Sequence, residues 1–429
     1  MALNPRLDAL QPYPFERWRQ LVAHWQSSQS APAVSAPSPI SLGMGEPRHA
    51  TPALIPQTLD AHRAGLSSYP ATKGEPFLRQ ACADWVQRRY GVALDAEREV
   101  LPVLGTREAL FSLAQALVDP VRAPSTAPAT VIAPNPFYQI YEGAALLAGA
   151  QPVYANCLAP GFEPDWSSIP DGVWPSVQLL YTCSPGNPTG AVTGLDGWRE
   201  LFERADRHGF VIASDECYSE IYPPGSPPPL GALQAAQELG RGFERLVVFT
   251  SLSKRSNAPG LRSGFVAGDA KVLAQYLLYR TYHGSAMSLP VQHASAAAWA
   301  DEAHVEDNRQ QYDAKFRAVT PLVQSVLDVQ RPPAGFYLWA GLTPSVLDAL
   351  QRRYGQPLDE HGTALSPDIV FALALLAETG VTVLPGSLLA RTSAGVNPGR
   401  NRLRLALVSP LDETVQAAQR LAAFVHALG

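Results

Sequence analysis

Arg245-Leu246-Val247-Val248-Phe249-Thr250-Ser251-Leu252-Ser253-Lys254 joins an apolar run to a lysine flanked by hydroxyl groups, and Arg262 follows eight residues later. The apolar run predicts a buried strand over residues 245–250. Lys254 would then lie on the loop at the carboxyl end of that strand, which is where open α/β sheets bind their ligands. A lysine in such a place suits Schiff-base chemistry, because burial or neighbouring cations can keep its amine neutral near pH 7.

Two further segments repeat the pattern of an apolar strand followed by polar residues. Val177-Gln178-Leu179-Leu180-Tyr181 predicts a strand, and the turn after it, which is rich in proline and glycine, carries Asn187. Phe210-Val211-Ile212-Ala213-Ser214 predicts another strand, which is followed directly by Asp215, with Tyr218 three residues further on. The polar side chains of both segments are therefore expected at the same edge of a sheet.

A fourth segment, Val103-Leu104-Gly105-Thr106-Arg107, predicts a strand that turns into a helix. Thr106 is a plausible helix cap, and the apolar residues after it have helical spacing. Such a turn directs backbone N–H groups and the positive end of the helix dipole at an anion. Strands alternate with helical stretches from about Tyr69 to Ala300, as expected for a doubly wound α/β domain.

Together these segments resemble fold type I pyridoxal-phosphate enzymes, specifically the class I/II aminotransferases, over nearly the whole chain. The order is a phosphate turn, an aromatic residue after a strand, an Asn turn, an Asp-x-x-Tyr strand, a lysine and an arginine. The resemblance implies a large, mostly parallel, seven-stranded sheet domain and a smaller α+β domain. The expected division is an N-terminal segment, 1–45, that joins the small domain, a large cofactor-binding domain, 46–300, and a small domain, 301–429.

The resemblance also assigns roles around pyridoxal 5′-phosphate. Lys254 would hold the cofactor as a Schiff base and then act as the base that moves the substrate's Cα proton. Asp215 would pair with the pyridine nitrogen and keep it protonated. Asn187 and Tyr218 would donate hydrogen bonds to the phenolic oxygen.

The phosphate group is expected to bind the backbone N–H groups of Thr106 and Arg107 and the side chains of Ser251 and Arg262. Tyr138 would stack on the cofactor ring, although an ordinary core aromatic is also compatible with the sequence.

Substrate recognition requires a cation for the α-carboxylate. Arg402 and Arg404 would share one face of a strand, so spacing alone leaves both open, and the resemblance selects Arg404. Gly45 matches a loop that passes close over the substrate, although a plain turn would also use glycine there. Tyr69 matches a tyrosine that the partner subunit lends to the phosphate, which implies a homodimer with composite sites.

Three segments, Asn4–Glu16, Gly45–Pro52 and Tyr279–Ser288, resemble the proteobacterial N-succinyldiaminopimelate aminotransferases of lysine and diaminopimelate biosynthesis. The implied reaction interconverts N-succinyl-2-L-amino-6-oxopimelate plus glutamate and N-succinyl-LL-2,6-diaminopimelate plus 2-oxoglutarate. This substrate carries distal carboxylates, so a second cationic subsite is expected, with Arg48, Arg280 and Arg391 as candidates.

Other readings of the same residues stay open. The chain could act on aspartate, alanine or aromatic amino acids, or it could be a lyase that uses the same lysine, aspartate and asparagine. A cofactor-binding regulator without turnover is disfavoured, because only about 40 residues precede the core and they lack a basic helix-turn-helix pattern.

Composition narrows the partners further. The net charge of −5 gives no basic field for nucleic acid or anionic membranes. No apolar run reaches the ~18 to 20 residues of a spanning helix, and the first residues lack a signal-peptide core, so a cytoplasmic protein is expected. The four cysteines have no metal-type spacing, which predicts free thiols and no metal site.

Overall fold

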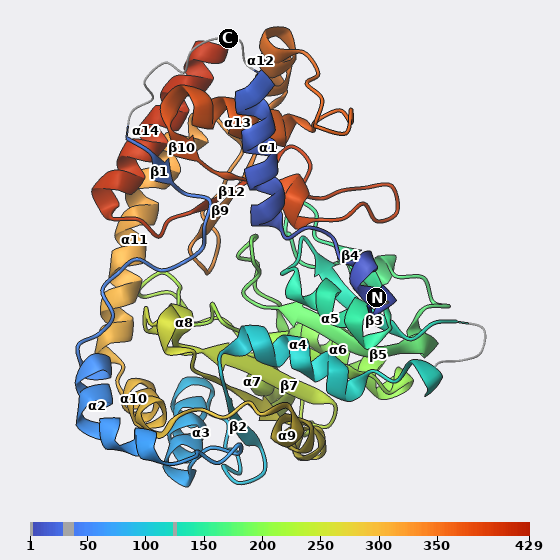
Figure 1. The fold of residues 1–429 in the computed structure, drawn as a ribbon, viewed down its shortest axis with the longest axis vertical. Coiled ribbons are helices and arrows are strands. Elements are labelled where there is room, and N and C mark those ends of the chain that lie inside the picture. The colour runs from blue at the N-terminus through green and yellow to red at the C-terminus, as the bar shows by residue number, and fades with distance from the viewer. Residues whose placement is uncertain (1–2, 29–37, 123–126) are drawn as a thin grey trace.

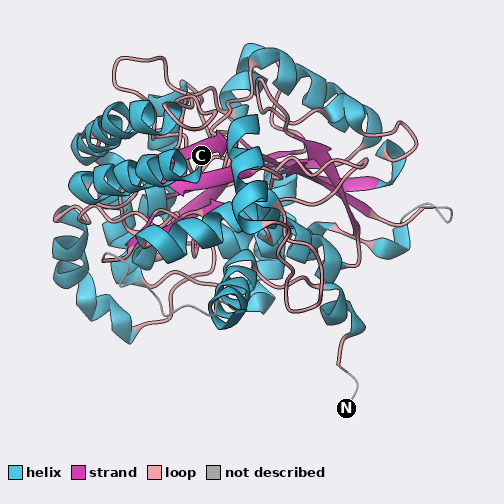
Figure 2. Ribbon diagram, turned by 90° about the horizontal axis from the view of Figure 1, so that it is seen from above, coloured by secondary structure: helices cyan, strands magenta, loops and turns pink. Residues whose placement is uncertain are grey.

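The computed structural model of the chain describes residues 3–28, 38–122 and 127–429. A seven-stranded sheet with helices on both faces forms the large part of the molecule (Figure 1). A three-stranded sheet, a two-stranded sheet and their helices form the small part. Figure 2 shows the strands passing between layers of helices.

The large sheet has the strand order β2-β8-β7-β6-β5-β3-β4. β8 runs antiparallel to both of its neighbours, and the other paired strands are parallel. The predicted mostly parallel seven-stranded sheet is therefore confirmed. Its strands are β2 (Val100–Val103), β3 (Thr130–Asn135), β4 (Gln151–Asn156), β5 (Val177–Cys183), β6 (Val211–Asp215), β7 (Leu246–Ser251) and β8 (Gly264–Gly268).

Both faces of this sheet are apolar because helices cover both of them. In β5, Leu179 and Tyr181 belong to the hydrophobic core on one face, and Leu180 belongs to the core on the other. One face packs against α4 (Thr106–Leu117), α5 (Ile140–Ala148) and α9 (Ala270–His283). The other packs against α2 (Leu54–His62), α3 (Pro76–Tyr90), α6 (Leu195–His208), α7 (Ala232–Glu238) and α10 (Leu289–Ala300).

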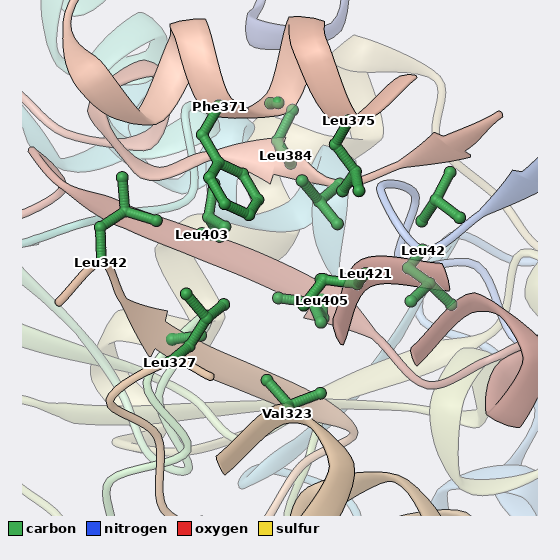
Figure 3. Packing of buried hydrophobic residues seen from close by; sticks show 14 of the residues in the cluster. Leu42, Val323, Leu327, Leu342, Phe371, Leu375, Leu384, Leu403, Leu405 and Leu421 are labelled. Atoms are coloured by element: carbon green, nitrogen blue, oxygen red, sulfur yellow. The ribbon is translucent and has the colours of Figure 1, made fainter. Parts of the chain in front are cut away.

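The small part is built around the antiparallel sheet β11-β12-β9. Its elements are α11 (Ala303–Gln324), β9 (Tyr337–Gly341), α12 (Pro344–Tyr354), α13 (Pro367–Thr379), β10 (Val381–Thr382), β11 (Leu384–Pro385), β12 (Arg402–Ala406) and α14 (Leu411–Leu428). Figure 3 shows its core, to which strands and helices contribute residues such as Leu327, Phe371, Leu403, Leu405 and Leu421. Burial of such side chains stabilises the fold by about 1.5 to 3 kcal/mol each.

The N-terminal segment contacts both parts. Trp18 and Leu21, on α1 (Pro14–Ser28), pack into the small part's core, and β1 (Ile40–Ser41) pairs with β10. The preceding turn of 3-10 helix, Pro5–Ala9, lies against α5 of the large part instead. The division into segments 1–45, 46–300 and 301–429 stays a prediction from the sequence. Among the described helices, none is both long enough and apolar enough to cross a membrane.

Candidate active site

A cavity of about 480 Å³ lies where β5 and β6 reach their carboxyl ends, beside β7 and α8 (Leu252–Arg255). Loops from the large part, the small part and the N-terminal segment all line it. Ten of the predicted site residues line this cavity, namely Gly45, Thr106, Arg107, Tyr138, Asn187, Asp215, Tyr218, Lys254, Arg262 and Arg404. Residues predicted from separate segments of sequence are thus brought into one place.

Lys254 lies in the short helix α8, which begins directly after β7. Its Nζ donates a hydrogen bond to the carbonyl oxygen of Gly45 at 2.6 Å. Burial lowers the pKa of Lys254 to about 8, and the nearby guanidinium group of Arg404 acts in the same direction. A large fraction of the amine is therefore neutral near pH 8, as a nucleophile or a base requires.

Asp215 is the last residue of β6 and is buried. The Tyr141 hydroxyl donates to its Oδ2 at 2.8 Å, and the backbone N–H of Cys217 donates to its Oδ1 at 3.3 Å. Burial raises the pKa of Asp215, although these hydrogen bonds and the charge of Lys254 oppose the rise. A buried carboxylate gains most from a cationic partner, and a protonated pyridine nitrogen is such a partner.

Gly105 and Arg262 form an anion cradle at the beginning of α4. Gly105 has φ of +79°, and a Cβ there would lie 2.5 Å from Nη2 of Arg262. Arg262 donates from Nη1 to the carbonyl oxygen of Pro259 at 2.8 Å, which holds its guanidinium group beside the helix N-terminus. The N–H groups at that end of α4 and the guanidinium group together suit a phosphate.

The prediction that Thr106 caps α4 through its side chain is wrong. Gly105 is the N-cap residue, Thr106 is the first residue of the helix, and no side chain caps this end. The Thr106 hydroxyl instead forms a hydrogen bond with Sγ of Cys217 at 3.0 Å. Glycine suits the N-cap position because the backbone there has a positive φ, which threonine disfavours. All four cysteines are free, as predicted, and Cys217 also lines the cavity.

Ser251 lies behind the cavity wall. Its buried Oγ accepts from the N–H of Ser253 at 3.0 Å, which caps α8, and donates to the carbonyl oxygen of Ser263 at 3.0 Å. Ser253, which the sequence interpretation did not select, lines the cavity. Ser251 and Ser253 are only two residues apart, so the sequence does not indicate which of them faces the cavity.

Arg404 is the arginine of β12 that reaches the cavity. Its Nη2 donates to the carbonyl oxygen of Gly43 at 2.8 Å, and its Nη1 donates to Oδ1 of Asn187 at 3.2 Å. Its buried Nε has no partner within the described residues, so the guanidinium group retains donor capacity. Arg402 stacks on Phe162 and does not line the cavity. Of the two arginines that strand alternation leaves open, Arg404 is the one that lines the cavity.

Asn187 and Tyr138 occupy the cavity wall near these charges. Asn187 uses its oxygen to accept from Arg404, which leaves its side-chain N–H₂ group free to donate elsewhere. The ring of Tyr138 packs edge-on against Tyr141 at 5.8 Å, and burial raises its pKa. Both residues line the cavity, and their roles toward the cofactor stay predictions.

Tyr69 is fully exposed and lies outside the cavity of its own chain. The three arginines suggested for a distal subsite also lie outside it. Arg280 is buried and pairs with Glu108 at 2.9 Å, Arg391 pairs with Glu142 at 2.7 Å, and Arg48 donates to Oγ of Ser409 at 3.2 Å. Each of these guanidinium groups thus has a structural partner.

Several cavity residues were missed from the sequence. Tyr13 and Phe15 come from the N-terminal segment, and Tyr337 comes from β9. Tyr337 explains why position 45 is a glycine, because a Cβ there would lie 2.0 Å from the Tyr337 hydroxyl. Aromatic residues at the beginning of a helix, as in α1, or of an apolar strand, as in β9, give no sign of such a role, because a core position predicts the same residue type.

Comparison with known proteins identifies the family. The sequence model of the family described as aminotransferase class I and II matches residues 37–421. The chain belongs to the class I and II aminotransferases. It is therefore a pyridoxal-phosphate-dependent aminotransferase that acts on amino and 2-oxo acids.

Individual relatives cover nearly the full chain. LL-diaminopimelate aminotransferase from Dehalococcoides mccartyi is 30% identical over 99% of both chains. The crystal structure of an aminotransferase from Neisseria meningitidis is 49% identical, covers 98% of this chain and 100% of its own, and has a TM-score of 0.88. A probable N-succinyldiaminopimelate aminotransferase from Thermus thermophilus is 25% identical, covers 95% and 99% of the two chains, and has a TM-score of 0.78.

The residues of the cavity fit pyridoxal phosphate. The anion cradle suits its phosphate, the buried Asp215 suits its pyridine nitrogen, and the Lys254 amine suits its aldehyde. The bound cofactor supplies an electron sink for the carbanion that forms at the substrate's Cα. With the cofactor bound, Lys254 would take the proton from that carbon, Arg404 would orient the α-carboxylate, and the walls of the cavity would exclude water.

Proposed function

We propose that this aminotransferase interconverts N-succinyl-LL-2,6-diaminopimelate plus 2-oxoglutarate and N-succinyl-2-L-amino-6-oxopimelate plus glutamate, in lysine and diaminopimelate biosynthesis. The observation that carries the proposal is a guanidinium group in the cavity besides those of Arg262, in the anion cradle, and Arg404. Arg107 lines the cavity, and its guanidinium carbon lies 5.5 Å from the centre of the Tyr13 ring. Within the described residues no carboxylate pairs with Arg107.

A free guanidinium group in a binding cavity favours a substrate with a carboxylate beyond the reacting end. N-succinyl-LL-2,6-diaminopimelate has two such carboxylates and no second ammonium group, so its distal end is purely anionic. 2-Oxoglutarate and glutamate also carry a distal carboxylate, and Arg107 would serve both half-reactions. Arg107 lines the cavity, whereas Arg48, Arg280 and Arg391 do not, so Arg107 replaces them as the candidate for the distal subsite.

LL-diaminopimelate itself is the second candidate, because the relative from Dehalococcoides mccartyi carries that name. Its distal end holds an ammonium group as well as a carboxylate. Glu46 lines the cavity and is the acidic residue there that could receive this ammonium group, since Asp215 lies buried at the end of β6. The two candidates therefore make different demands on Arg107 and Glu46.

Steady-state kinetics with both compounds test the proposal. We expect a higher kcat/KM for the succinylated substrate, a fall of about tenfold or more in Arg107→Gln, and little change in Glu46→Gln. L-Alanine, which has no distal carboxylate, serves as the control substrate for Arg107→Gln. A higher kcat/KM for LL-diaminopimelate that falls in Glu46→Gln would replace the proposal with the second candidate. A preference for aspartate, alanine or aromatic amino acids would overturn both.

We also propose that the enzyme is a homodimer with composite sites. Tyr69 matches a tyrosine that reaches the partner's cofactor phosphate, and its fully exposed side chain is available for such a contact. Leu66, in the same segment, is another exposed apolar residue that a second copy would cover.

A further inference from the structure

Tyr337 connects three groups of the active site that lie on different parts of the chain. It is buried on β9 and lines the cavity. Its hydroxyl lies 3.0 Å from the hydroxyl of Tyr218, which follows β6 in the large part. Figure 1 shows β9 on the side of the molecule that holds α12 to α14, whereas α8, the helix that contains Lys254, lies with the large sheet.

The ring of Tyr337 makes the second contact. The guanidinium carbon of Arg404 lies 4.6 Å from the centre of this ring, a cation–π arrangement. Because the charge of Arg404 is buried, the ring face restricts its position while two hydrogen bonds fix its nitrogens. Tyr337 therefore supports the guanidinium group of Arg404, which is expected to bind the substrate's α-carboxylate.

Gly45 is the third contact. A side chain at this position would collide with the Tyr337 hydroxyl, and the carbonyl oxygen of Gly45 accepts from Nζ of Lys254 at 2.6 Å. The Tyr337 hydroxyl thus lies against the backbone of Gly45, whose carbonyl oxygen holds the amine of Lys254. A single side chain of the small part touches the hydroxyl, the guanidinium group and the loop that surround the reacting centre.

We propose that Tyr337 is a positioning residue, which orients the Tyr218 hydroxyl through its own hydroxyl and the Arg404 guanidinium group through its ring. A hydroxyl that accepts one hydrogen bond becomes a stronger donor in the next. When Tyr337 donates to Tyr218, the Tyr218 hydroxyl is directed away from Tyr337 and donates more strongly to the cofactor's phenolic oxygen. The proposal rests on the cofactor chemistry of the family, and it stands or falls independently of the substrate proposed above.

Two substitutions separate the hydroxyl from the ring. Tyr337→Phe removes only the hydroxyl and keeps the ring under Arg404, whereas Tyr337→Leu removes both. Tyr312→Phe is the matched control, because Tyr312 is a buried tyrosine that packs on the neighbouring Phe336 and whose hydroxyl has no partner within the described residues. Tyr218→Phe reports the full effect of losing the donor to the cofactor.

The first measurement is the pH midpoint at which the absorption of the lysine-bound cofactor changes. A weaker donor to the phenolic oxygen favours the protonated form, so we expect the midpoint to rise by about 0.3 to 1 unit in Tyr337→Phe. The rise should be smaller than in Tyr218→Phe and absent in Tyr312→Phe. A role in folding alone would leave the midpoint unchanged.

The second measurement is a titration of the same band with propionate, a carboxylate that cannot react. We expect its Kd to be unchanged in Tyr337→Phe and raised severalfold in Tyr337→Leu. An unchanged midpoint in Tyr337→Phe overturns the hydroxyl's role, whether or not Tyr218→Phe shifts it. An unchanged propionate Kd in Tyr337→Leu overturns the role of the ring. If Tyr337→Leu does not fold, Tyr337→Met repeats the second test.

Discussion

The chemistry of the site depends most on Lys254, whose ordinary pKa would keep it almost fully charged near neutral pH. Burial and nearby guanidinium groups lower that pKa to about 8. The neutral amine is the form that attacks an aldehyde and takes a proton, so this burial favours both reactions of Lys254 near neutral pH.

The reaction of the cofactor-free protein with pyridoxal phosphate should report this pKa directly. Because protonation blocks the amine, we expect the rate of cofactor attachment to rise with pH through a midpoint of about 8 and to level off above it. Stopped-flow absorbance measures the rate. Lys254→Ala is the control, which should fold normally but show no attachment and no turnover. A midpoint near 10.5 would show that the environment does not lower the pKa.

Arg404 and Arg402 provide a matched pair on one strand. Arg404→Ala should lower kcat/KM for every amino-acid substrate by a factor corresponding to roughly 2 to 5 kcal/mol, because a buried charge-assisted pair with the α-carboxylate is lost. Arg402→Ala removes a guanidinium group that stacks on Phe162 outside the cavity, and it should leave kcat/KM nearly unchanged. Equal effects of the two substitutions would contradict the assignment.

At the scale of secondary-structure elements, the sequence predicts strands more reliably than the details at their ends. The apolar runs before Asn187, Asp215 and Lys254 predict β5, β6 and β7 correctly, because strands buried on both faces require such runs. The sequence favours Thr106 as the cap of α4, whereas the structure places Gly105 there. Both residue types occur at helix N-termini, and the sequence does not show the backbone angle that distinguishes them.

Gly105 and Gly91 test the cradle at the beginning of α4. Both have positive φ, at +79° and +68°, but a Cβ at Gly105 would meet Arg262, whereas a Cβ at Gly91 would meet nothing within 4 Å. Alanine at Gly91, whose ψ of 15° is left-handed helical, should cost about 1 kcal/mol of stability. Alanine at Gly105, whose ψ of 158° belongs to a region that is almost exclusive to glycine, should cost about 1 to 3 kcal/mol. In addition, we expect Gly105→Ala to raise the Kd of the apoprotein for pyridoxal phosphate about tenfold or more. Thermal melting of both variants checks the change in stability, and fluorescence titration checks the Kd. Equal Kd values would show that the cradle does not bind the phosphate.

At the scale of the whole molecule, the site exists only because distant segments meet. Tyr13, Gly45, Tyr337 and Arg404 reach the cavity from the N-terminal segment and the small part, whereas Lys254 belongs to the large part. Local sequence patterns predict each strand and turn, but they carry no information about which aromatic residue of a remote element faces the site. The sequence does not single out Tyr13 and Tyr337 for this reason.

A composite site in a homodimer gives a test that depends on assembly. Lys254→Ala and Tyr69→Ala should each be weakly active or inactive alone. After the two variants are unfolded and refolded together, about a quarter of all sites should be intact, because half of the dimers are mixed and each mixed dimer has one complete site. Restored activity in the mixture supports the composite site. Activity that stays at the level of the separate variants would mean that Tyr69 serves its own chain or no site at all.

The most direct test of the proposed reaction is a single-turnover experiment on the cofactor-loaded enzyme without an acceptor. Glutamate and N-succinyl-LL-2,6-diaminopimelate are added separately, and the absorption of the lysine-bound cofactor is followed in time. We predict that both compounds convert the cofactor to its amine form, with release of the matching 2-oxo acid. Conversion by glutamate alone would keep the enzyme an aminotransferase and contradict the proposed substrate.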